Sequence, residues 1–545
     1  MVNVYDDNIP KYLGLSGNAL ITSQTLLVGL PSFILFGYNQ AGMGGALSLP
    51  EFGKYFPMLS TLDKEGSAKS QASTLQGVFV STFSLGALLG AVFCSFFGDR
   101  LGRKKTILLG ALLVLVGEIL ECSAFSVGQL CTGRTILGIG IGMLNVTVPS
   151  WQSECSKPKN RGKHVALDGA FISLGYLLTN WISFGFYMGN HSQATWRVPI
   201  AIGAIFNFPL IFAIIKLPES PRWLIMKGRI NEAREILASI NGTNIEDDII
   251  LQEIENIEIS NCQSAKTDAK FIDLFKMGEE KLLMRFLMCM SLQCLQQMSG
   301  GNLISVYSTT LYQESLGMSG KLSRILSSCT LTFKFFCGFI AFFTVDRYGR
   351  RLLLTISGSG MALCMLFLAV TTSQPDNFSA NIASVFFIFA FNFFIPIGFL
   401  GINWLYVTEI SPTKYRTYIS AILSANNWIW NFVVTMITPI AIQSIAYRYY
   451  IIYAVIGAVI PIMVLTFFPE TLGLELEAID LIFKKSSSPW TVVKTAKEER
   501  NTLLSHDLSQ TKELRSQLPP KIYSEHKEYI KSDKGEKSVD SASVV

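Results

Sequence analysis

The feature that most constrains this chain is a series of apolar segments, each about 20 residues long, that recurs along most of its 545 residues. A helix of that length crosses the hydrocarbon core of a bilayer, where helices and closed barrels alone satisfy every backbone polar group. Only 16% of the residues are charged, against roughly 25% in soluble domains. We therefore predict an all-α membrane protein with twelve transmembrane helices, near residues 21–47, 74–98, 106–125, 130–151, 164–188, 196–217, 282–315, 323–345, 352–372, 382–410, 417–440 and 446–468.

Three short patterns occur twice, about 250 residues apart, and indicate a duplicated unit. They are an acidic-Arg-x-Gly-Arg-basic motif at 99–104 and 346–351, a Glu with an Arg seven residues later at 154 and 409, and a Pro-Glu pair at 218–219 and 469–470. The duplication predicts two pseudo-symmetric six-helix bundles around a central site, which is the architecture of alternating access.

The distribution of basic residues predicts the orientation of the chain. Short loops rich in Lys and Arg follow the second, fourth, eighth and tenth spans, so the positive-inside rule puts both termini in the cytoplasm. The predicted organisation is a cytoplasmic segment 1–20, a bundle 21–217, a cytoplasmic helical linker 218–281, a bundle 282–468 and a cytoplasmic, mostly disordered tail 469–545 with a short amphipathic helix near 475–483. Asn190 and Asn377, each in an Asn-x-Ser sequence, then lie outside as candidate glycosylation sites of a multi-pass plasma-membrane protein.

One span carries an unusual group of polar side chains. After an apolar start at 282, the segment contains Gln296, Gln297, Ser299 and Asn302, with two glycines between them. Unpaired polar groups are costly in hydrocarbon, so these side chains are expected to face a bundle interior or a water-filled cavity. The pattern favours a broken helix that offers amides to a neutral polyhydroxylated ligand, while the alternative is that the amides only join helices.

The sequence QQMSGGN at 296–302, followed by YS at 307–308, resembles the seventh-helix signature of the sugar porters, the sugar transporter family of the major facilitator superfamily. The resemblance extends over roughly residues 25–485 and is closest to fungal members. It implies that Gln296, Gln297 and Asn302 contact sugar hydroxyls, and it adds Trp404 and Asn427 in the tenth and eleventh spans. Amides suit hydroxyl groups and an indole suits the apolar face of a sugar ring; the alternative for Trp404 is simple core packing.

The resemblance also assigns a gating role to charged residues at the cytoplasmic ends of the spans. Ion pairs among them would hold one state of the transporter and break as the halves rock. The alternative is that they only orient the chain. The residues are Asp99, Arg103, Glu154 and Arg161 in the first half and Asp346, Arg350, Glu409 and Arg416 in the second.

Two departures from the family pattern affect the substrate and its coupling. Lys334 stands where many members have a cavity-facing Asn, and we expect it to bind substrate and to pair with Asp168 of the opposite half. Asn39 stands where proton-coupled members have an Asp that pairs with an Arg, here Arg134. The Lys334 departure leaves the choice between a hexose and a smaller polyol open, and the Asn39 departure concerns the coupling to protons.

Asn39 cannot take up a proton, so the usual switch is absent and facilitated diffusion is expected. Arg134 still needs a counter-charge in the membrane. Its depth in the hairpin of spans three and four matches that of Glu121, with Glu118 one turn deeper, so one of these two carboxylates should neutralise it. The alternative is that Glu118, Glu121 or Asp168 has taken over proton coupling.

The chain is not expected to be an enzyme. It has only four His, no span pairs a nucleophile with a base, and no phosphate-binding loop is present. A cofactor, a metal and nucleic acid are not expected partners; the expected partners are a small neutral sugar or polyol, the bilayer and, in the alternative, protons. The competing functions are a proton-coupled sugar or glycerol symporter and a sensor that binds sugar without moving it.

Overall fold

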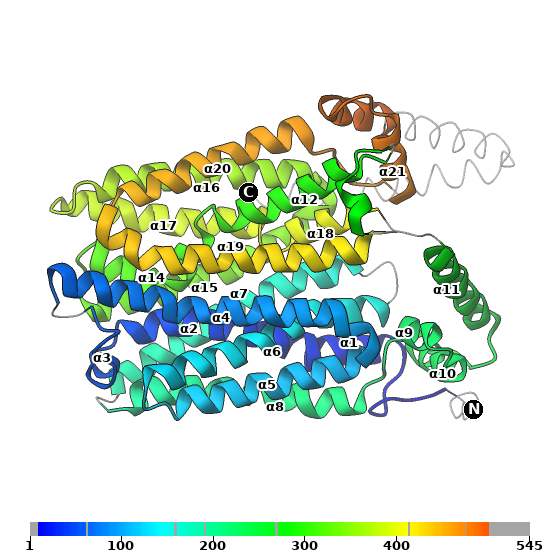
Figure 1. Ribbon diagram of the computed structural model, residues 1–545, viewed down its shortest axis with the longest axis horizontal. Coiled ribbons are helices and arrows are strands. Elements are labelled where there is room, and N and C mark those ends of the chain that lie inside the picture. Colours follow the sequence, from blue (N-terminus) through cyan, green and yellow to red (C-terminus); the bar gives the residue numbers. More distant parts are fainter. Residues whose placement is uncertain are drawn as a thin grey trace, which may run out of the picture.

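The computed structural model describes residues 9–61, 64–156, 161–189, 192–266, 271–278, 280–412, 415–474 and 476–500. Over these residues the chain folds into long helices that lie side by side, with short helices at the two ends of the bundle (Figure 1). This agrees with the all-α prediction. Nine helical segments of the described chain are long and apolar enough to cross a membrane.

The first half supplies six of the predicted spans. In Figure 1 most of them lie in the lower part of the bundle, whereas α7 lies in its middle beside α15 of the second half. In order they are Gly17–Leu47, built from α1 (Gly17–Gln24), η1 (Thr25–Gly29) and α2 (Leu30–Leu47), then α4 (Gly66–Leu101), α5 (Arg103–Cys122), α6 (Val127–Glu154), α7 (Arg161–Gly189) and α8 (Ala194–Lys216), with the short α3 (Pro50–Tyr55) after the first span.

The second half supplies the other six spans. The seventh is broken into α12 (Leu282–Gln297), α13 (Gly301–Val306), α14 (Ser308–Thr310) and η4 (Leu311–Ser315). The tenth is also broken, into α17 (Phe378–Gly398) and α18 (Ile402–Ile410). The remaining spans are α15 (Gly320–Tyr348), α16 (Arg350–Thr372), α19 (Arg416–Ile445) and α20 (Arg448–Phe467).

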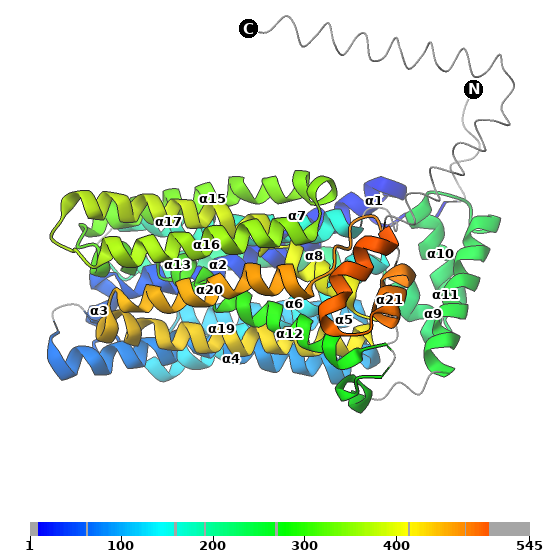
Figure 2. The same ribbon diagram turned by 90° about the horizontal axis from the view of Figure 1, so that it is seen from above.

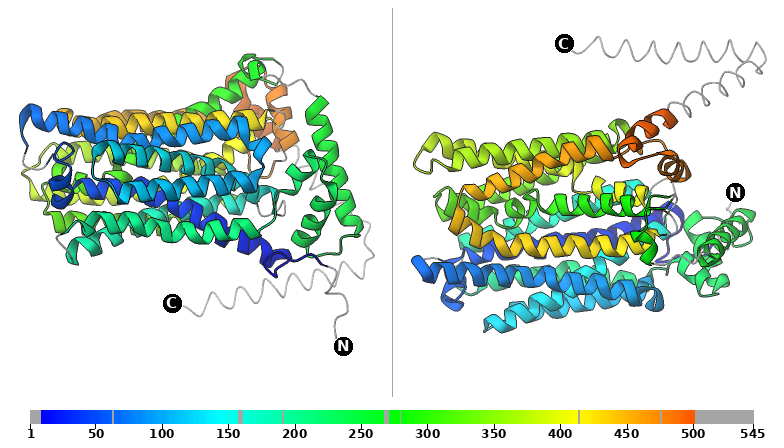
Figure 3. Two further views of the ribbon diagram at one scale, coloured as in Figure 1. Left: turned by 60° about the horizontal axis from the view of Figure 1, so that its bottom comes forward. Right: turned by 45° about the horizontal axis from the view of Figure 1, so that its top comes forward.

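The short helices outside the spans gather at one end of the bundle, opposite α3 (Figures 2 and 3). They are α9 (Pro221–Met226), α10 (Ile230–Asn241), α11 (Asp248–Lys266), η3 (Phe271–Phe275), α21 (Leu476–Lys485) and η5 (Pro489–Thr491). The amphipathic helix predicted near 475–483 is therefore present as α21. Within the described part of the tail, residues 476–485 and 489–500 are helical, and residues 501–545 lie outside the described residues.

α21 is held on the second half by buried basic residues at the start of the seventh span. The Arg285 guanidinium, 1% exposed, donates to the Ile410 carbonyl at 2.7 Å and to Asp480 of α21 at 2.6 Å, and it lies 4.6 Å from the Phe483 ring. Lys281 donates to Ser486 directly after α21. One cation therefore joins the inner end of α18 to the C-terminal helix.

The two halves contact each other along paired long helices. α4 packs along α19, and α7 packs along α15. Trp428 of α19 is fully buried in the core of the first half, with its ring centroid 5.5 Å from that of Phe36 and 5.9 Å from that of Phe83. A side chain of one half thus fills the core of the other.

The break in the seventh span occurs where the sequence predicts it. Gly300 has φ +91°, a conformation that disfavours residues with a side chain, and a Cβ there would lie 3.2 Å from the Tyr453 ring and 2.4 Å from the end of Met365. The break places Gln297 at the end of α12 and Asn302 in the first turn of α13, so both amides come to the same region of the bundle interior.

Gly300→Ala should lower the stability of the folded protein by about 1–2 kcal/mol, because a Cβ is strained at this positive φ. The measurement is thermal unfolding of the purified protein in detergent. The control is Gly185→Ala in α7, where no atom lies within 4 Å of the new Cβ. Equal melting temperatures for the two variants would contradict a conformational requirement at Gly300.

Candidate functional site

Five polar side chains form a continuous hydrogen-bonded series, here called the amide chain, that crosses between the two halves. Tyr176 of α7 donates to Gln40 of α2 at 2.8 Å, and Gln40 donates to Asn302 of α13 at 3.3 Å. Asn302 then donates to Gln297, and Gln297 donates to Asn427 of α19 at 2.7 Å. All five side chains are buried. The series brings three predicted site residues together and connects them to the first half.

Gln296 lies beside the amide chain and contacts the broken tenth span. Its side-chain nitrogen donates to the Phe399 carbonyl at 2.9 Å, and its oxygen accepts from Asn403 at the start of α18. Trp404 follows Asn403 and is half-buried. Among the described residues, no hydrogen bond joins Trp404 to the amide chain. Gln296 therefore connects the breaks of the seventh and tenth spans.

Lys334 lies in α15, close to the contact between the two halves, but its partners differ from the prediction. Its side chain is 2% exposed and donates to Ser305 of α13 at 2.7 Å, with the nitrogen 4.8 Å from the centre of the Tyr176 ring. No ion pair joins Lys334 to Asp168 in the described part of the chain, so the predicted pairing is wrong. Asp168 precedes Tyr176 by more than two helical turns on α7, which separates the two groups along the seam.

The buried Asp168 carboxylate is instead left with one oxygen that has no hydrogen-bond partner among the described residues. Among the described residues, neither Lys334 nor Asp168 belongs to an ion pair.

The charge of Arg134 is compensated as predicted. Its guanidinium lies 4.0 Å from the Glu121 carboxylate and donates to the backbone carbonyl of Asn39 at 3.0 Å. The Asn39 side chain donates to Glu118 at 3.1 Å. A cavity of about 20 Å³, enough for roughly one water molecule, lies beside Asn39, Glu121 and Arg134. The four groups thus form a nearly dry cluster inside the first half.

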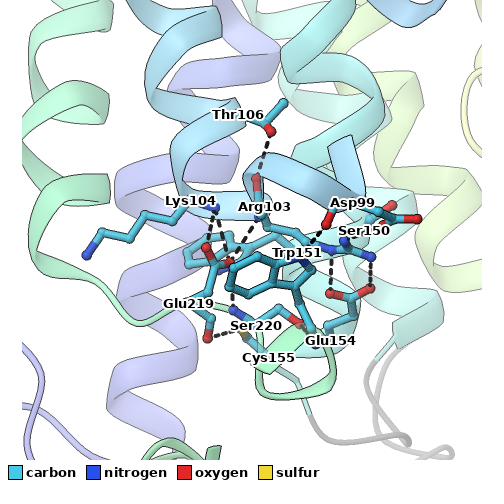
Figure 4. Close-up of polar contacts among 12 residues, drawn as sticks. Asp99, Arg103, Lys104, Thr106, Ser150, Trp151, Glu154, Cys155, Glu219 and Ser220 are labelled. Atoms are coloured by element: carbon cyan, nitrogen blue, oxygen red, sulfur yellow. Dashed lines mark hydrogen bonds and ion pairs between the residues drawn. The ribbon is translucent and has the colours of Figure 1, made fainter. Parts of the chain in front are cut away.

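The charged residues at the end of the bundle that carries α9–α11 form a compact cluster in the first half (Figure 4). Arg103 donates to Asp99 at 2.7 Å and to both oxygens of Glu154 at 3.0 and 3.1 Å. Glu219, after α8, accepts from the backbone N–H groups of Arg103 and Lys104 at 3.1 Å. The cluster therefore joins the inner ends of α4, α5 and α6 to the chain that leaves α8.

The second half repeats this arrangement. Arg350 donates to Glu409 at 3.0 Å, and Glu470 accepts from the backbone N–H groups of Arg350 and Arg351 at 3.0 and 3.1 Å. The two helices whose N–H groups are bound, α5 and α16, each begin directly after a glycine with a positive φ. These are Gly102 at +87° and Gly349 at +86°. In both halves a Glu thus binds the free N–H groups at a helix N-terminus, where negative charge is favoured.

The Glu219 carboxyl is partly buried at this site, and this burial raises its pKa above the ordinary value. The backbone N–H groups of Ser220, Lys104 and Arg103 act in the opposite direction because they stabilise the ionised form. The carboxylate is therefore held in place by donors from two separate segments.

Several predicted residues lie outside what the structure describes. Asn190 is one, and nothing is described of the Arg161, Asp346 and Arg416 side chains. Asn377 is exposed, and its side-chain oxygen accepts from the backbone N–H groups of Ser379 and Ala380 at the start of α17.

Sequence reasoning missed six residues that complete these sites. Gln40, Tyr176, Ser305 and Asn403 contact the predicted amides and Lys334, and Glu219 with its counterpart Glu470 binds the helix N-termini. A signal existed for Gln40, which follows Asn39 in an otherwise apolar span, and for the duplicated Pro-Glu pair. Tyr176 and Ser305 carry no distinguishing pattern.

Comparison with known proteins gives a consistent result. The family model described as "Sugar (and other) transporter" matches residues 25–483. The sugar transporter STL1 of Saccharomyces cerevisiae is 32% identical over 519 residues, covering 92% of this chain and 90% of the relative. The major facilitator superfamily transporter mfsA of Aspergillus fumigatus is 34% identical over 480 residues, covering 87% of this chain and 88% of the relative.

A solved structure has the same fold. The proton:xylose symporter XylE bound to 6-bromo-6-deoxy-D-glucose superposes with a TM-score of 0.72 at 22% identity, covering 86% of this chain and 100% of that chain. This likeness confirms the predicted architecture of twelve transmembrane helices in two bundles.

Glu219→Ala should destabilise the protein by about 1–3 kcal/mol, because it leaves partly buried backbone N–H groups at the start of α5 without their acceptor. Glu470→Ala should have a similar effect in the second half. Thermal unfolding of the purified variants is the measurement, and Glu255→Ala on the exposed face of α11 is the control. A loss no larger than that of Glu255→Ala would argue against the capping role.

Proposed function

Because this chain belongs to the sugar transporter family of the major facilitator superfamily, we propose that it moves a neutral sugar or polyol across the membrane by alternating access. The observation that carries the proposal is the amide chain, which joins the two halves through groups that both donate and accept hydrogen bonds. It does not act as an enzyme.

The chemistry of the amide chain supports a polyhydroxylated substrate. Each amide in the chain forms a hydrogen bond with another amide or with a hydroxyl group. Amides carry no net charge, so they do not favour an ionic ligand. A sugar hydroxyl also donates and accepts, and it can exchange with these bonds without leaving a buried group unpaired. We assign Gln296, Gln297, Asn302 and Asn427 to the hydroxyl contacts.

Two further residues are proposed to complete the site. The Lys334 ammonium group lies beside Ser305 and over the Tyr176 ring, adjacent to the amide chain, and it can only donate. It therefore suits a hydroxyl oxygen of the substrate. Trp404 is proposed to pack against the apolar face of the ligand, with its place in α18 directly after Asn403 as the support.

The charged clusters are proposed to stabilise the cytoplasmic ends of each half during the rocking motion. The described ion pairs of Arg103 with Asp99 and Glu154, and of Arg350 with Glu409, each lie within one half. They support a role in holding each set of helices as a rigid unit. For Arg161, Asp346 and Arg416 a gating role rests on the sequence pattern alone.

We propose the plasma membrane as the location, with both termini, the linker 218–281 and the tail 469–545 in the cytoplasm and the bundles at 21–217 and 282–468. The support is the positive-inside pattern together with the gathering of α9–α11 and α21 at one end of the bundle. Asn377, exposed at the opposite end, is then available for glycosylation.

Facilitated diffusion is the proposed mode of transport. Asn39 stands in place of the titratable group of proton-coupled members, and its side chain donates a hydrogen bond to Glu118. Glu121 balances the charge of Arg134. The competing mode is a proton symport in which Glu118 or Glu121 takes up the proton, since two carboxylates share this cluster with one guanidinium.

Replacing Gln297 or Asn302 by Ala should raise KM about fivefold or more, which corresponds to at least about 1 kcal/mol for one buried hydrogen bond. The assay is uptake of labelled hexoses and glycerol by transporter-deficient cells, with surface expression quantified. Asn207→Ala is the matched control, since this buried amide binds Ala111 within the first half. Unchanged KM in both site variants would refute the assignment, and binding without any uptake would favour the sensor.

Uptake should proceed without substrate-evoked proton entry, and an uncoupler should not lower the final internal concentration. Glu118→Gln should retain uptake because facilitated diffusion needs no proton acceptor there. Accumulation against a gradient that collapses with the uncoupler, and is lost in Glu118→Gln, would instead identify proton symport. Asn39→Asp tests whether a titratable group at this position introduces a pH dependence that the parent protein lacks.

A further inference from the structure

Arg324 is a buried cation at the end of the bundle opposite the charged clusters. It lies in the first turns of α15 and is 5% exposed. Its guanidinium donates to the carbonyl oxygens of Gly45 at 3.1 Å and Ser48 at 2.9 Å, and it lies 4.5 Å from the centre of the Tyr187 ring. In the described part of the chain no carboxylate forms an ion pair with it.

The acceptors explain why an arginine fits here. Gly45 and Ser48 lie at the C-terminal end of α2, where the last carbonyls have no partner within the helix and carry the negative end of its dipole. A guanidinium presents several N–H groups in a fixed plane, so one side chain can satisfy two such carbonyls together. The two hydrogen bonds from Arg324 to Gly45 and Ser48 are called the α2–α15 clasp below.

The clasp joins the two halves. Arg324 belongs to the second half, whereas α2 and the Tyr187 helix, α7, belong to the first. Two neighbouring contacts close the same seam: Thr61 donates to Glu314 at 3.0 Å, and Gly44 lies so close to α13 that a Cβ would be 1.8 Å from the Val306 carbonyl. The first span is therefore sealed against α13–α15 at this end.

We propose that Arg324 is a positioning residue that holds the extracellular gate closed through the α2–α15 clasp, and that outward opening requires its release. The proposal rests on the proposed function, because it takes this end of the bundle as extracellular and the motion as alternating access. When the halves separate here, the guanidinium and the α2 carbonyls pass to water, which satisfies both. An arginine keeps its charge at every accessible pH, so the clasp does not respond to pH.

The test measures how often the extracellular seam opens. Thr310→Cys places a thiol in the narrow crevice lined by Ser48, Thr61 and Glu314. In intact cells, its labelling rate by a membrane-impermeant thiol reagent is measured against the same chain without this substitution. Adding Arg324→Met should raise the rate about tenfold, the change that about 1.4 kcal/mol produces in an opening equilibrium.

Arg324→Lys gives a second measurement if the Met variant does not reach the surface. It keeps the charge but lacks the planar fork that spans two carbonyls, so labelling should again increase. The control is Arg448→Met, an exposed arginine at the start of α20 at the same end of the bundle, which should leave labelling unchanged. Arg324→Met and Arg324→Lys should also favour the outward-open state, which lowers the KM for external substrate and reduces the maximal rate of uptake.

The outcomes separate this proposal from the proposed function. Unchanged labelling in both Arg324 variants, with sugar uptake intact, would overturn the clasp and leave transport standing. Increased labelling in a chain that takes up none of the sugars or polyols would support the clasp and overturn the transported substrate class. An equal increase in Arg448→Met would also overturn the clasp, because any loss of surface charge would then suffice.

Discussion

The structure depends on how backbone groups at helix ends are satisfied where water is scarce. Each break or end of a span exposes N–H or carbonyl groups that lipid cannot bind. In this chain charged side chains from other segments bind them: Glu219 and Glu470 bind helix N-termini, while Arg285 and Arg324 bind the carbonyls at the ends of α18 and α2. These charged side chains thereby join the ends of different helices to each other.

The bundle interior follows a different rule. There the seventh and tenth spans are broken, and neutral amides rather than charges fill the gap. Neutral groups can exchange partners without a large desolvation penalty, whereas an ion pair buried at the same depth would resist separation. The ion pairs of Arg103 and Arg350 within each half thus gather at one end of the bundle, and neutral amides lie where the broken spans meet the first half.

Much of the architecture could be predicted from the sequence because each signal was local. Span length, the duplicated patterns and the break at Gly300 follow from hydropathy, spacing and glycine chemistry. The pairing of Arg134 with Glu121 followed from depth in a single hairpin. The pairing of Lys334 with Asp168 failed because helices of different halves have no fixed register, so equal depth could not be counted along the chain. Contacts to backbone carbonyls, such as those of Arg324, leave no mark in the side-chain pattern.

The docking of α21 determines where this polypeptide can be shortened or extended. Arg285 and Lys281 are buried against residues 480–486, so a truncation before this helix would leave two basic side chains without their partners at the entrance of the seventh span. A fluorescent protein or affinity tag fused after residue 500 would leave these contacts in place. The C-terminal boundary of a minimal transporter is therefore set by α21 rather than by the last membrane helix.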